Sequence, residues 1–205
     1  MPGGEPDRVS RGHSAPGRLA PIGWRTDVQF AGRLNLARVG MFGFSLGGAT
    51  AAASMLADAH LKAGADLDGS LYGPVAHAGL RRPFLLMLSP IPAAFKKRCG
   101  ARCHGLSEFH FFRPFYSHLR GPRFAVELKD SGHESFEDSV WIKPQLATVD
   151  PATARQFDVG SISAHAAVAT VSGYLTAFFD HYLRGSPEPL LREPSRTYPD
   201  LRPLH

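Results

Sequence analysis

The feature that most constrains the fold of this chain is the run Gly43-Phe44-Ser45-Leu46-Gly47-Gly48, which matches the pattern G-x-S-x-G. It follows an apolar stretch, Leu34–Phe42, typical of a buried strand, and small residues continue to Ala59 as in a helix packed on a sheet. Gly43 and Gly47 have no side chains, so a strand and a helix can approach closely around Ser45. The pattern therefore predicts a sharp strand–turn–helix unit that exposes the Ser45 hydroxyl. The alternative is a glycine-rich turn in which Ser45 caps the helix.

The rest of the chain alternates predicted strands with predicted helices. We expect further strands at Ala63–Asp68, Phe84–Leu88 and Phe124–Leu128. We expect helices at Phe109–Leu119, on either side of a proline, and at Ser163–Arg184, where apolar residues recur at helical spacing before a glycine. This alternation indicates an α/β fold with a mainly parallel sheet flanked by helices.

A length of 205 residues suits one domain with a hydrophobic core. We expect a flexible Pro/Gly/Arg-rich leader at residues 1–28, a folded domain at residues 29–187 and a Pro-rich tail at residues 188–205. The first 20 residues lack the apolar core of a signal peptide. The sequence also contains no run of about 18 consecutive apolar residues, the length that would suggest a membrane-spanning helix. The sequence therefore predicts no transmembrane segment and, by default, a cytoplasmic location; secretion would follow if the true N-terminus were missing.

The formal net charge of +5 raises the question of a nucleic-acid partner. The basic residues are mostly scattered and no nucleic-acid-binding motif accompanies them, so we predict no such partner. The one dense basic cluster consists of Lys96, Lys97, Arg98 and Arg102. We interpret it as a solvated loop. The alternative is a peripheral contact with an anionic surface or lipid head group.

A serine hydroxyl is a poor nucleophile unless a base removes its proton and a carboxylate orients that base. After a G-x-S-x-G turn the expected chain order is Ser, then Asp or Glu, then His. Among the histidines that follow Ser45, His133 lies in a loop directly after a predicted strand, in Asp130-Ser131-Gly132-His133. The carboxyl end of that strand would deliver His133 to Ser45, so we predict that His133 is the base.

The predicted acid is Asp68, which closes the strand that follows the nucleophile helix. The next strand, Phe84–Leu88, ends in Ser89-Pro90 and offers no carboxylate nearby, which favours Asp68. Asp66, two residues earlier on the same strand face, is the main competitor. The backbone N–H of Leu46, near the helix N-terminus, is the predicted oxyanion-hole donor. Together these residues predict hydrolysis of a carboxylic ester through an acyl-enzyme.

The sequence also resembles a known family, the platelet-activating-factor acetylhydrolase-like group of bacterial α/β-hydrolases. The resemblance extends roughly from Gln29 to Arg202 and rests on these stretches: Gly43–Thr50, Ala65–Gly69, Gly73-Pro74, Ser131–Asp138, Ala177–Gly185 and Pro189–Leu191. It implies an α/β-hydrolase fold with Ser45 as nucleophile, Asp68 as orienting acid and His133 as base. It further implies a calcium-independent serine esterase or lipase that acts on short acyl esters or modified phospholipids, with no metal and no cofactor.

Two features depart from the pattern of that family. Phe44 stands where the family usually has His, and should affect the shape of the pocket more than the chemistry. The family also places several strands and a second oxyanion-hole N–H before the nucleophile strand, whereas the residues before that strand here show no strand pattern. We therefore expect a fold truncated before the nucleophile strand, with an exposed sheet edge that favours a homodimer. Loss of one of two oxyanion donors costs roughly 10²–10³ in rate.

Other interpretations stay open. The chain would be a non-catalytic fragment or pseudoenzyme serving as an interaction module, or a cutinase-like or dienelactone-type hydrolase with a different substrate. Cys99, Cys103 and His104 share one loop but have no evident fourth ligand, so we predict loop thiols or a local disulfide rather than a zinc site. We interpret the nearby aromatic run as helix packing rather than an acyl pocket or membrane contact; it consists of Phe109, Phe111, Phe112, Phe115 and Tyr116.

Overall fold

The structure, a computed structural model, describes residues 32–91, 112–191 and 196–204. The sheet and all its helices belong to the compact unit that starts at Leu36. The predicted basic cluster and the loop with Cys99, Cys103 and His104 lie outside the described residues, as do Phe109 and Phe111.

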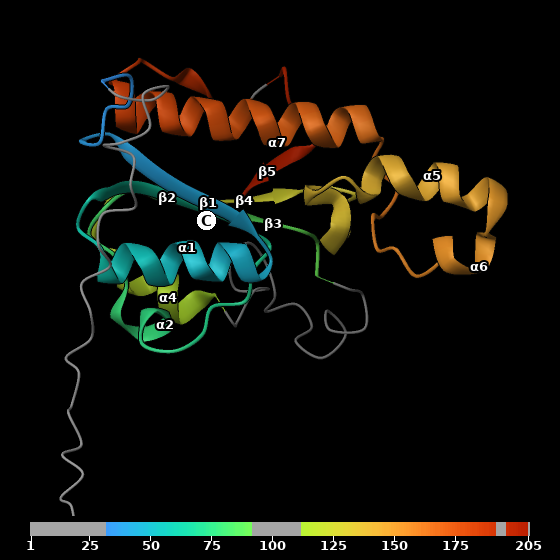
Figure 1. The fold of residues 1–205 in the computed structure, drawn as a ribbon, viewed down its shortest axis with the longest axis horizontal. Coiled ribbons are helices and arrows are strands. Elements are labelled where there is room, and N and C mark those ends of the chain that lie inside the picture. The colour runs from blue at the N-terminus through green and yellow to red at the C-terminus, as the bar shows by residue number, and fades with distance from the viewer. Residues whose placement is uncertain (1–31, 92–111, 192–195, 205) are drawn as a thin grey trace, which may run out of the picture. The chain divides into compact units, whose positions relative to one another are not determined.

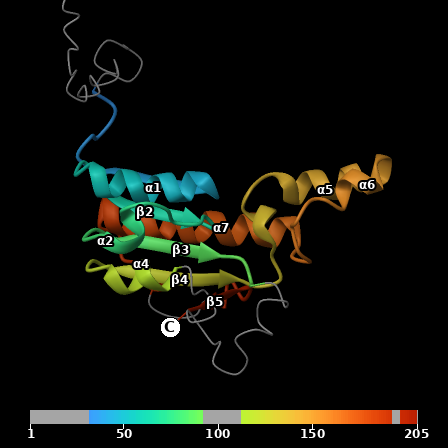
Figure 2. The same ribbon diagram turned by 90° about the horizontal axis from the view of Figure 1, so that it is seen from below.

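One five-stranded sheet, with the strand order β1-β2-β3-β4-β5, is the centre of this unit. The strands are β1 (Val39–Phe44), β2 (Leu61–Leu67), β3 (Phe84–Leu88), β4 (Arg123–Leu128) and β5 (Leu201–Pro203). The first four are parallel, and β5 pairs antiparallel with β4 (Figure 2). The mainly parallel sheet predicted from the sequence is therefore confirmed.

Helices cover both faces of the sheet (Figure 1). On one face lie α1 (Leu46–Ala57), α2 (Val75–Ala78) and α4 (Arg113–His118); on the other lies the long helix α7 (Ala164–Phe179). The remaining helical segments are η3 (His133–Phe136), α5 (Ser139–Val149), α6 (Pro151–Ala154), η4 (Asp180–Arg184) and η5 (Pro189–Leu191). Between β4 and β5 the chain therefore passes from the His133 loop to the α7 face.

The central strand β3 connects the two halves of the hydrophobic core. All five of its residues are buried. Leu85 and Met87 belong to the core under α7, whereas Phe84, Leu86 and Leu88 belong to the core under α1 and α4. This division follows from the two-residue period of a strand, which sends successive side chains to opposite faces. Burial of each such side chain stabilises the fold by about 1.5–3 kcal/mol, so the end of β3 is a rigid platform.

The boundaries of the elements differ in detail from the sequence prediction. The first strand begins at Val39 rather than Leu34 and continues through Phe44. The predicted helix Ser163–Arg184 consists of α7 and one π-helical turn, η4. The sequence did not predict α5, whose exposed apolar residues and internal Pro144 give no clear amphipathic period. Nor did it predict β5, a three-residue strand in the proline-rich tail.

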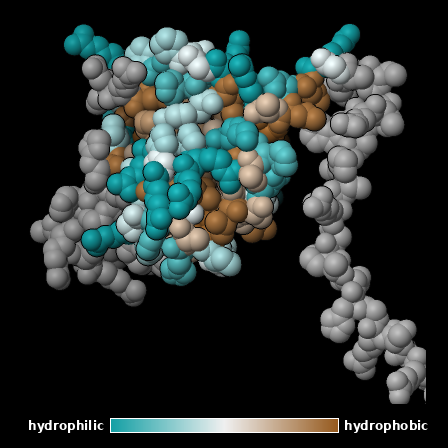
Figure 3. Space-filling model, turned by 90° about the vertical axis from the view of Figure 1, so that its left-hand side faces the viewer, coloured by the Kyte–Doolittle hydropathy of each residue, from teal (hydrophilic) through white to brown (hydrophobic). Residues whose placement is uncertain are grey.

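Strand β1 is an edge of the sheet among the residues that the structure describes. It pairs with β2, and the Phe42 side chain on it is 55% exposed. The parallel strands end on the side of the molecule where α5 lies (Figure 1), which is where the site described below forms. Figure 3 shows the opposite side, where hydrophilic and hydrophobic residues intermingle. None of the described helices is long and apolar enough to cross a membrane.

Candidate active site

Ser45 occupies a sharp turn between β1 and α1. Its backbone has φ 53° and ψ −120°, a conformation that L-residues rarely adopt. The Ser45 N–H donates to the carbonyl of Leu67 at 2.9 Å, which ties the turn to the end of β2. Ser45 is the N-cap residue of α1 by position, but its side chain makes no capping hydrogen bond to the helix. The strained turn instead leaves the hydroxyl free to act elsewhere.

Glycines permit the close approach of β1 and α1, but of the two glycines expected to do so only Gly43 is crowded. A Cβ at Gly43 would collide with the backbone of Gly47, so the close approach is at Gly43. A Cβ on Gly47 itself would point into open space. A Cβ on Gly48 would collide with the carboxyl group of Asp66. Gly43 and Gly48 are therefore the positions where the turn tolerates no side chain.

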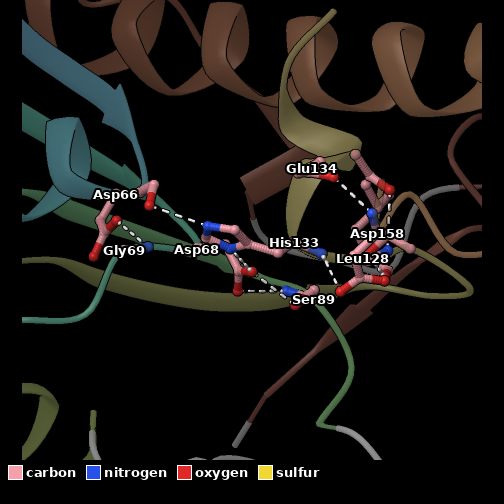
Figure 4. Close-up of polar contacts among 12 residues, drawn as sticks. Asp66, Asp68, Gly69, Ser89, Leu128, His133, Glu134 and Asp158 are labelled. Carbon is pink, nitrogen blue, oxygen red and sulfur yellow. Dashed lines mark hydrogen bonds and ion pairs between the residues drawn. The ribbon is translucent and has the colours of Figure 1, made fainter. Parts of the chain in front are cut away.

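The structure brings Ser45, His133 and Asp68 together from three separate parts of the chain. The His133 Nε2 atom lies 3.0 Å from the Ser45 hydroxyl oxygen. Its Nδ1 atom lies 2.8 Å from Asp68 Oδ2, a contact that Figure 4 shows. Both distances are those of hydrogen bonds. Each of the three residues directly follows the carboxyl end of a parallel strand or the turn after it, so the sheet topology explains why they meet.

His133 has surroundings that favour its protonated form. The hydrogen bond that His133 donates to Asp68 raises the pKa of His133 above its ordinary value of 6.5, and the charges of Asp68, Glu134 and Asp158 act in the same direction. Partial burial of the imidazole opposes this rise but does not cancel it. The side chain of His133 is 43% exposed. An imidazole of this kind can accept a proton from Ser45 and later return it.

The loop that carries His133 is held by a second loop before α7. The backbone N–H of His133 donates to Asp158 Oδ2 at 3.2 Å, and the N–H of Glu134 donates to the Asp158 carbonyl at 2.8 Å. In return, the N–H of Asp158 donates to Glu134 Oε2 at 2.6 Å (Figure 4). These reciprocal bonds fix the backbone of His133. The roles of Glu134 and Asp158 were not predicted from the sequence, because no local sequence pattern indicates a contact between residues so far apart in the chain.

Asp68 is held by Ser89, a residue whose role the sequence did not reveal. The N–H of Ser89 donates to Asp68 Oδ1 at 2.9 Å, and its hydroxyl donates to Asp68 Oδ2 at 2.7 Å. The side chain of Asp68 is only 12% exposed. No carboxylate follows β3 closely in the sequence, where Ser89-Pro90 comes next. The sequence signal that could have revealed this contact is the hydroxyl of Ser89, which directly follows β3, the strand that pairs with β2.

Asp66, the competing candidate for the acid, does not contact His133 in the described structure. Its side chain is fully buried beneath the turn, where Oδ1 accepts a hydrogen bond from the Gly69 N–H at 2.8 Å. Burial raises the pKa of Asp66 well above its ordinary value of 3.8, and the Gly69 bond offsets only part of this rise. Asp66 and Asp68 do not share a strand face, because β2 ends at Leu67 and Asp68 has φ 56°.

Two neighbours of Ser45 complete the site. The ring of Phe44 packs against the imidazole of His133, with centroids 4.7 Å apart and planes tilted by 42°. Phe44 is therefore in direct contact with the imidazole of His133. Leu46 is the first residue of α1, where a backbone N–H has no acceptor within the helix. That N–H is available next to Ser45 as a donor to an oxyanion.

No group of three or more His, Cys, Asp or Glu side chains in the described parts of the chain could hold a metal ion. The described residues around Ser45 offer hydrogen-bonding and acid–base groups. Such an arrangement can carry out nucleophilic attack, proton transfer and stabilisation of a negative charge.

Known proteins of two kinds resemble this chain, although no protein-family model matches it. The sequence is 27% identical over 177 residues to a protein of Arthroderma benhamiae described as a probable 1-alkyl-2-acetylglycerophosphocholine esterase, covering 80% of this chain and 43% of that protein. The structure matches a ferulic acid esterase from Streptomyces cinnamoneus with a TM-score of 0.69 and 28% identity, covering 84% of this chain and 48% of the other. The chain thus spans about half the length of each.

Proposed function

We propose that this chain, which has the α/β-hydrolase fold and is similar to two esterases, hydrolyses carboxylic esters through an acyl-enzyme formed on Ser45. The observation that supports this most strongly is the chain of hydrogen bonds from Ser45 through His133 to Asp68, which starts at a strained backbone turn. In this proposal Ser45 is the nucleophile, His133 the general base and acid, and Asp68 the residue that orients His133.

The first half of the reaction forms the acyl-enzyme. His133 Nε2 takes the hydroxyl proton as Ser45 Oγ attacks the carbonyl carbon of the ester. Asp68 Oδ2 accepts the Nδ1–H bond, which selects the tautomer with Nε2 free and stabilises the imidazolium. The Leu46 N–H donates to the oxyanion that develops on the carbonyl oxygen. Collapse of this intermediate breaks the ester C–O bond, and His133 gives its proton to the departing alcohol oxygen.

The second half repeats these steps with water. His133 Nε2 takes a proton from a water molecule, whose oxygen attacks the acyl carbon, and Ser45 leaves with that proton. The products are a carboxylic acid and the free enzyme. We propose short acyl esters, including the acetyl ester of an ether phospholipid, as the substrate class, since one of the two relatives is described by that kind of substrate. The other relative makes feruloyl esters the competing class.

The test is covalent labelling of the purified chain with a fluorophosphonate, with Ser45→Ala as the control. We expect labelling of the wild type and none of the variant, because the phosphonate reacts with an activated serine. Labelling should decrease at acidic pH, with a midpoint above the ordinary pKa of histidine, because protonated His133 cannot take the Ser45 proton. A folded, monodisperse wild type that is not labelled would contradict the proposal and favour a non-catalytic interaction module.

A substrate panel then separates the two ester classes. Acetyl to octanoyl p-nitrophenyl esters, an acetylated ether phospholipid and methyl ferulate would be compared by kcat/KM. We expect the highest kcat/KM for the acetyl esters. A preference for methyl ferulate would contradict the proposed substrate class while leaving the mechanism intact.

A further inference from the structure

Ser89 is the residue outside the proposed triad that binds the triad most directly. It is the first residue after β3, so its backbone is fixed by a strand that is buried along its whole length. Both of its donors reach Asp68, one to each carboxylate oxygen. The Asp68 N–H also donates to the carbonyl of Met87 at 2.8 Å, which continues the β2–β3 ladder one residue past the end of β2. Backbone and side chain of Asp68 are thus both held by the end of β3.

This contact matters because, apart from the bond from His133 itself, the two bonds from Ser89 are the hydrogen bonds that hold the Asp68 carboxylate in the described structure. Asp68 lies beyond the end of β2 with φ 56°, a conformation that a non-glycine residue holds only under constraint from its surroundings. Rotation of the carboxylate would move Oδ2 away from His133 Nδ1, which lies 2.8 Å from it. The Ser89 N–H on Oδ1 and the Ser89 hydroxyl on Oδ2 together oppose that rotation (Figure 4).

The hydroxyl also shares the oxygen that His133 uses. Asp68 Oδ2 accepts from Ser89 Oγ–H at 2.7 Å and from His133 Nδ1–H at 2.8 Å. A second donor on the same oxygen draws away part of the negative charge that faces the imidazole. Without the hydroxyl, His133 would be the only donor to Asp68 Oδ2 in the described structure. More of the negative charge on that oxygen would then face the imidazole, and the protonated form of His133 would be more stable.

We propose that Ser89 is a positioning residue of the site: its hydroxyl sets the orientation of Asp68 and moderates the charge that Asp68 presents to His133. This proposal rests on the proposed function, because it assigns Ser89 a part in the same proton transfers. Ser89 does not touch Ser45 or the space in front of it by any described contact, so it acts through Asp68.

Ser89→Ala tests the proposal, because the variant loses the hydroxyl and keeps the N–H bond to Oδ1. We expect fluorophosphonate labelling at its pH plateau to be slower by roughly tenfold, the size expected for a lost hydrogen bond to a charged group. The rate falls because Oδ2, the oxygen that His133 uses, is oriented less tightly without the hydroxyl. The remaining N–H on Oδ1 still keeps the carboxylate in contact with the imidazole and leaves more of its charge to His133. The pKa of His133 should therefore rise, and the acidic limb of the pH profile should move to higher pH. Ser89→Thr keeps a hydroxyl and should restore both values.

The matched control is Ser117→Ala, which removes a hydroxyl that donates to the Pro114 carbonyl on α4. It should change neither the labelling rate nor the pH profile. If Ser89→Ala does not fold, as judged by its thermal unfolding, Ser89→Cys takes its place, because a thiol is a weak donor of similar size.

An NMR titration of His133 in wild type and variants, assigned with His133→Gln, separates this proposal from the proposed function. A rise of the His133 pKa in Ser89→Ala would support the role of Ser89 even in a chain that no fluorophosphonate labels. A wild type that is labelled, together with a Ser89→Ala variant of unchanged rate and unchanged His133 titration, would overturn it. A Ser89→Thr variant as impaired as Ser89→Ala would also overturn it.

Discussion

Asp66 and Asp68 are chemically identical residues two positions apart, and the structure gives them opposite environments. Asp66 lies on β2 and is fully buried under the Ser45 turn, so its pKa is raised well above the ordinary value, mainly by desolvation. Asp68 lies just past the strand end, where three donors reach its carboxylate: the Ser89 N–H, the Ser89 hydroxyl and the His133 Nδ1–H. Local backbone geometry, rather than residue type, therefore decides which acid can serve His133.

The Asp66→Asn variant tests this difference, because the amide keeps an acceptor for the Gly69 N–H and cannot ionise. Labelling at Ser45 should persist in Asp66→Asn and fall steeply in Asp68→Asn. The stability of the wild type should also decline relative to Asp66→Asn as the pH rises above the ordinary value of 3.8, since the unfolded carboxyl ionises before the buried one. Urea unfolding at pH 4 and pH 8 measures this. If labelling were lost in Asp66→Asn and kept in Asp68→Asn, then Asp66 and not Asp68 would be the acid that orients His133.

At the scale of elements, the short strand β5 supports the strand that delivers His133. It pairs antiparallel with β4, which ends five residues before His133. An ion pair between a buried carboxylate and a half-exposed guanidinium crosses this strand pair: the Arg202 guanidinium lies 2.8 Å from Glu127 Oε2, and the Glu127 side chain is 5% exposed. The carboxylate of Glu127 thus depends on a residue from the far end of the chain.

Arg202→Met should destabilise the fold by about 1–3 kcal/mol, because it leaves Glu127 buried without this partner. The full cost of breaking a buried pair is larger, but the Arg202 side chain is 43% exposed and solvent screens part of it. The double variant Glu127→Gln/Arg202→Met should be more stable than Arg202→Met, since no buried charge remains. Urea unfolding at pH 7 gives both values. A double variant less stable than Arg202→Met would refute this account of the pair.

At the scale of the whole molecule, the sheet ends on one side at β1 in the part of the chain that the structure describes. The nucleophile turn thus follows an edge strand whose Phe42 side chain is largely exposed. The chain spans about half the length of each of the two esterases named above. An unpaired strand edge with an exposed aromatic side chain favours pairing with another chain.

We therefore expect the purified chain to self-associate, and Phe42→Lys to reduce this because a charge on an edge strand opposes pairing. Val149→Lys is the matched control: it makes the same kind of change at a residue of α5 that is 79% exposed. Multi-angle light scattering over a range of concentrations measures the mass. A wild type that stays monomeric throughout would argue against an edge open to pairing.

How far the sequence predicted this molecule depends on the range of the interactions involved. The α/β-hydrolase fold is confirmed, and four of the five strands were predicted, because apolar period and glycine placement are local signals. The segments α5 and β5 were missed. The exposed residues of α5 have no periodic apolar face, and β5 forms only because β4 offers it an edge.

The sequence by itself determined the nucleophile turn and named Ser45, Asp68 and His133, whose catalytic roles stay predictions. A strained turn needs glycines at fixed positions, and the order of Ser, acid and His follows from a parallel sheet. Only the tertiary structure decided what surrounds these residues: the burial of Asp66, the hold of Ser89 on Asp68 and the bonds of Asp158 to the His133 loop. Burial and hydrogen bonds between distant segments depend on how strands and loops pack, and no local pattern encodes them.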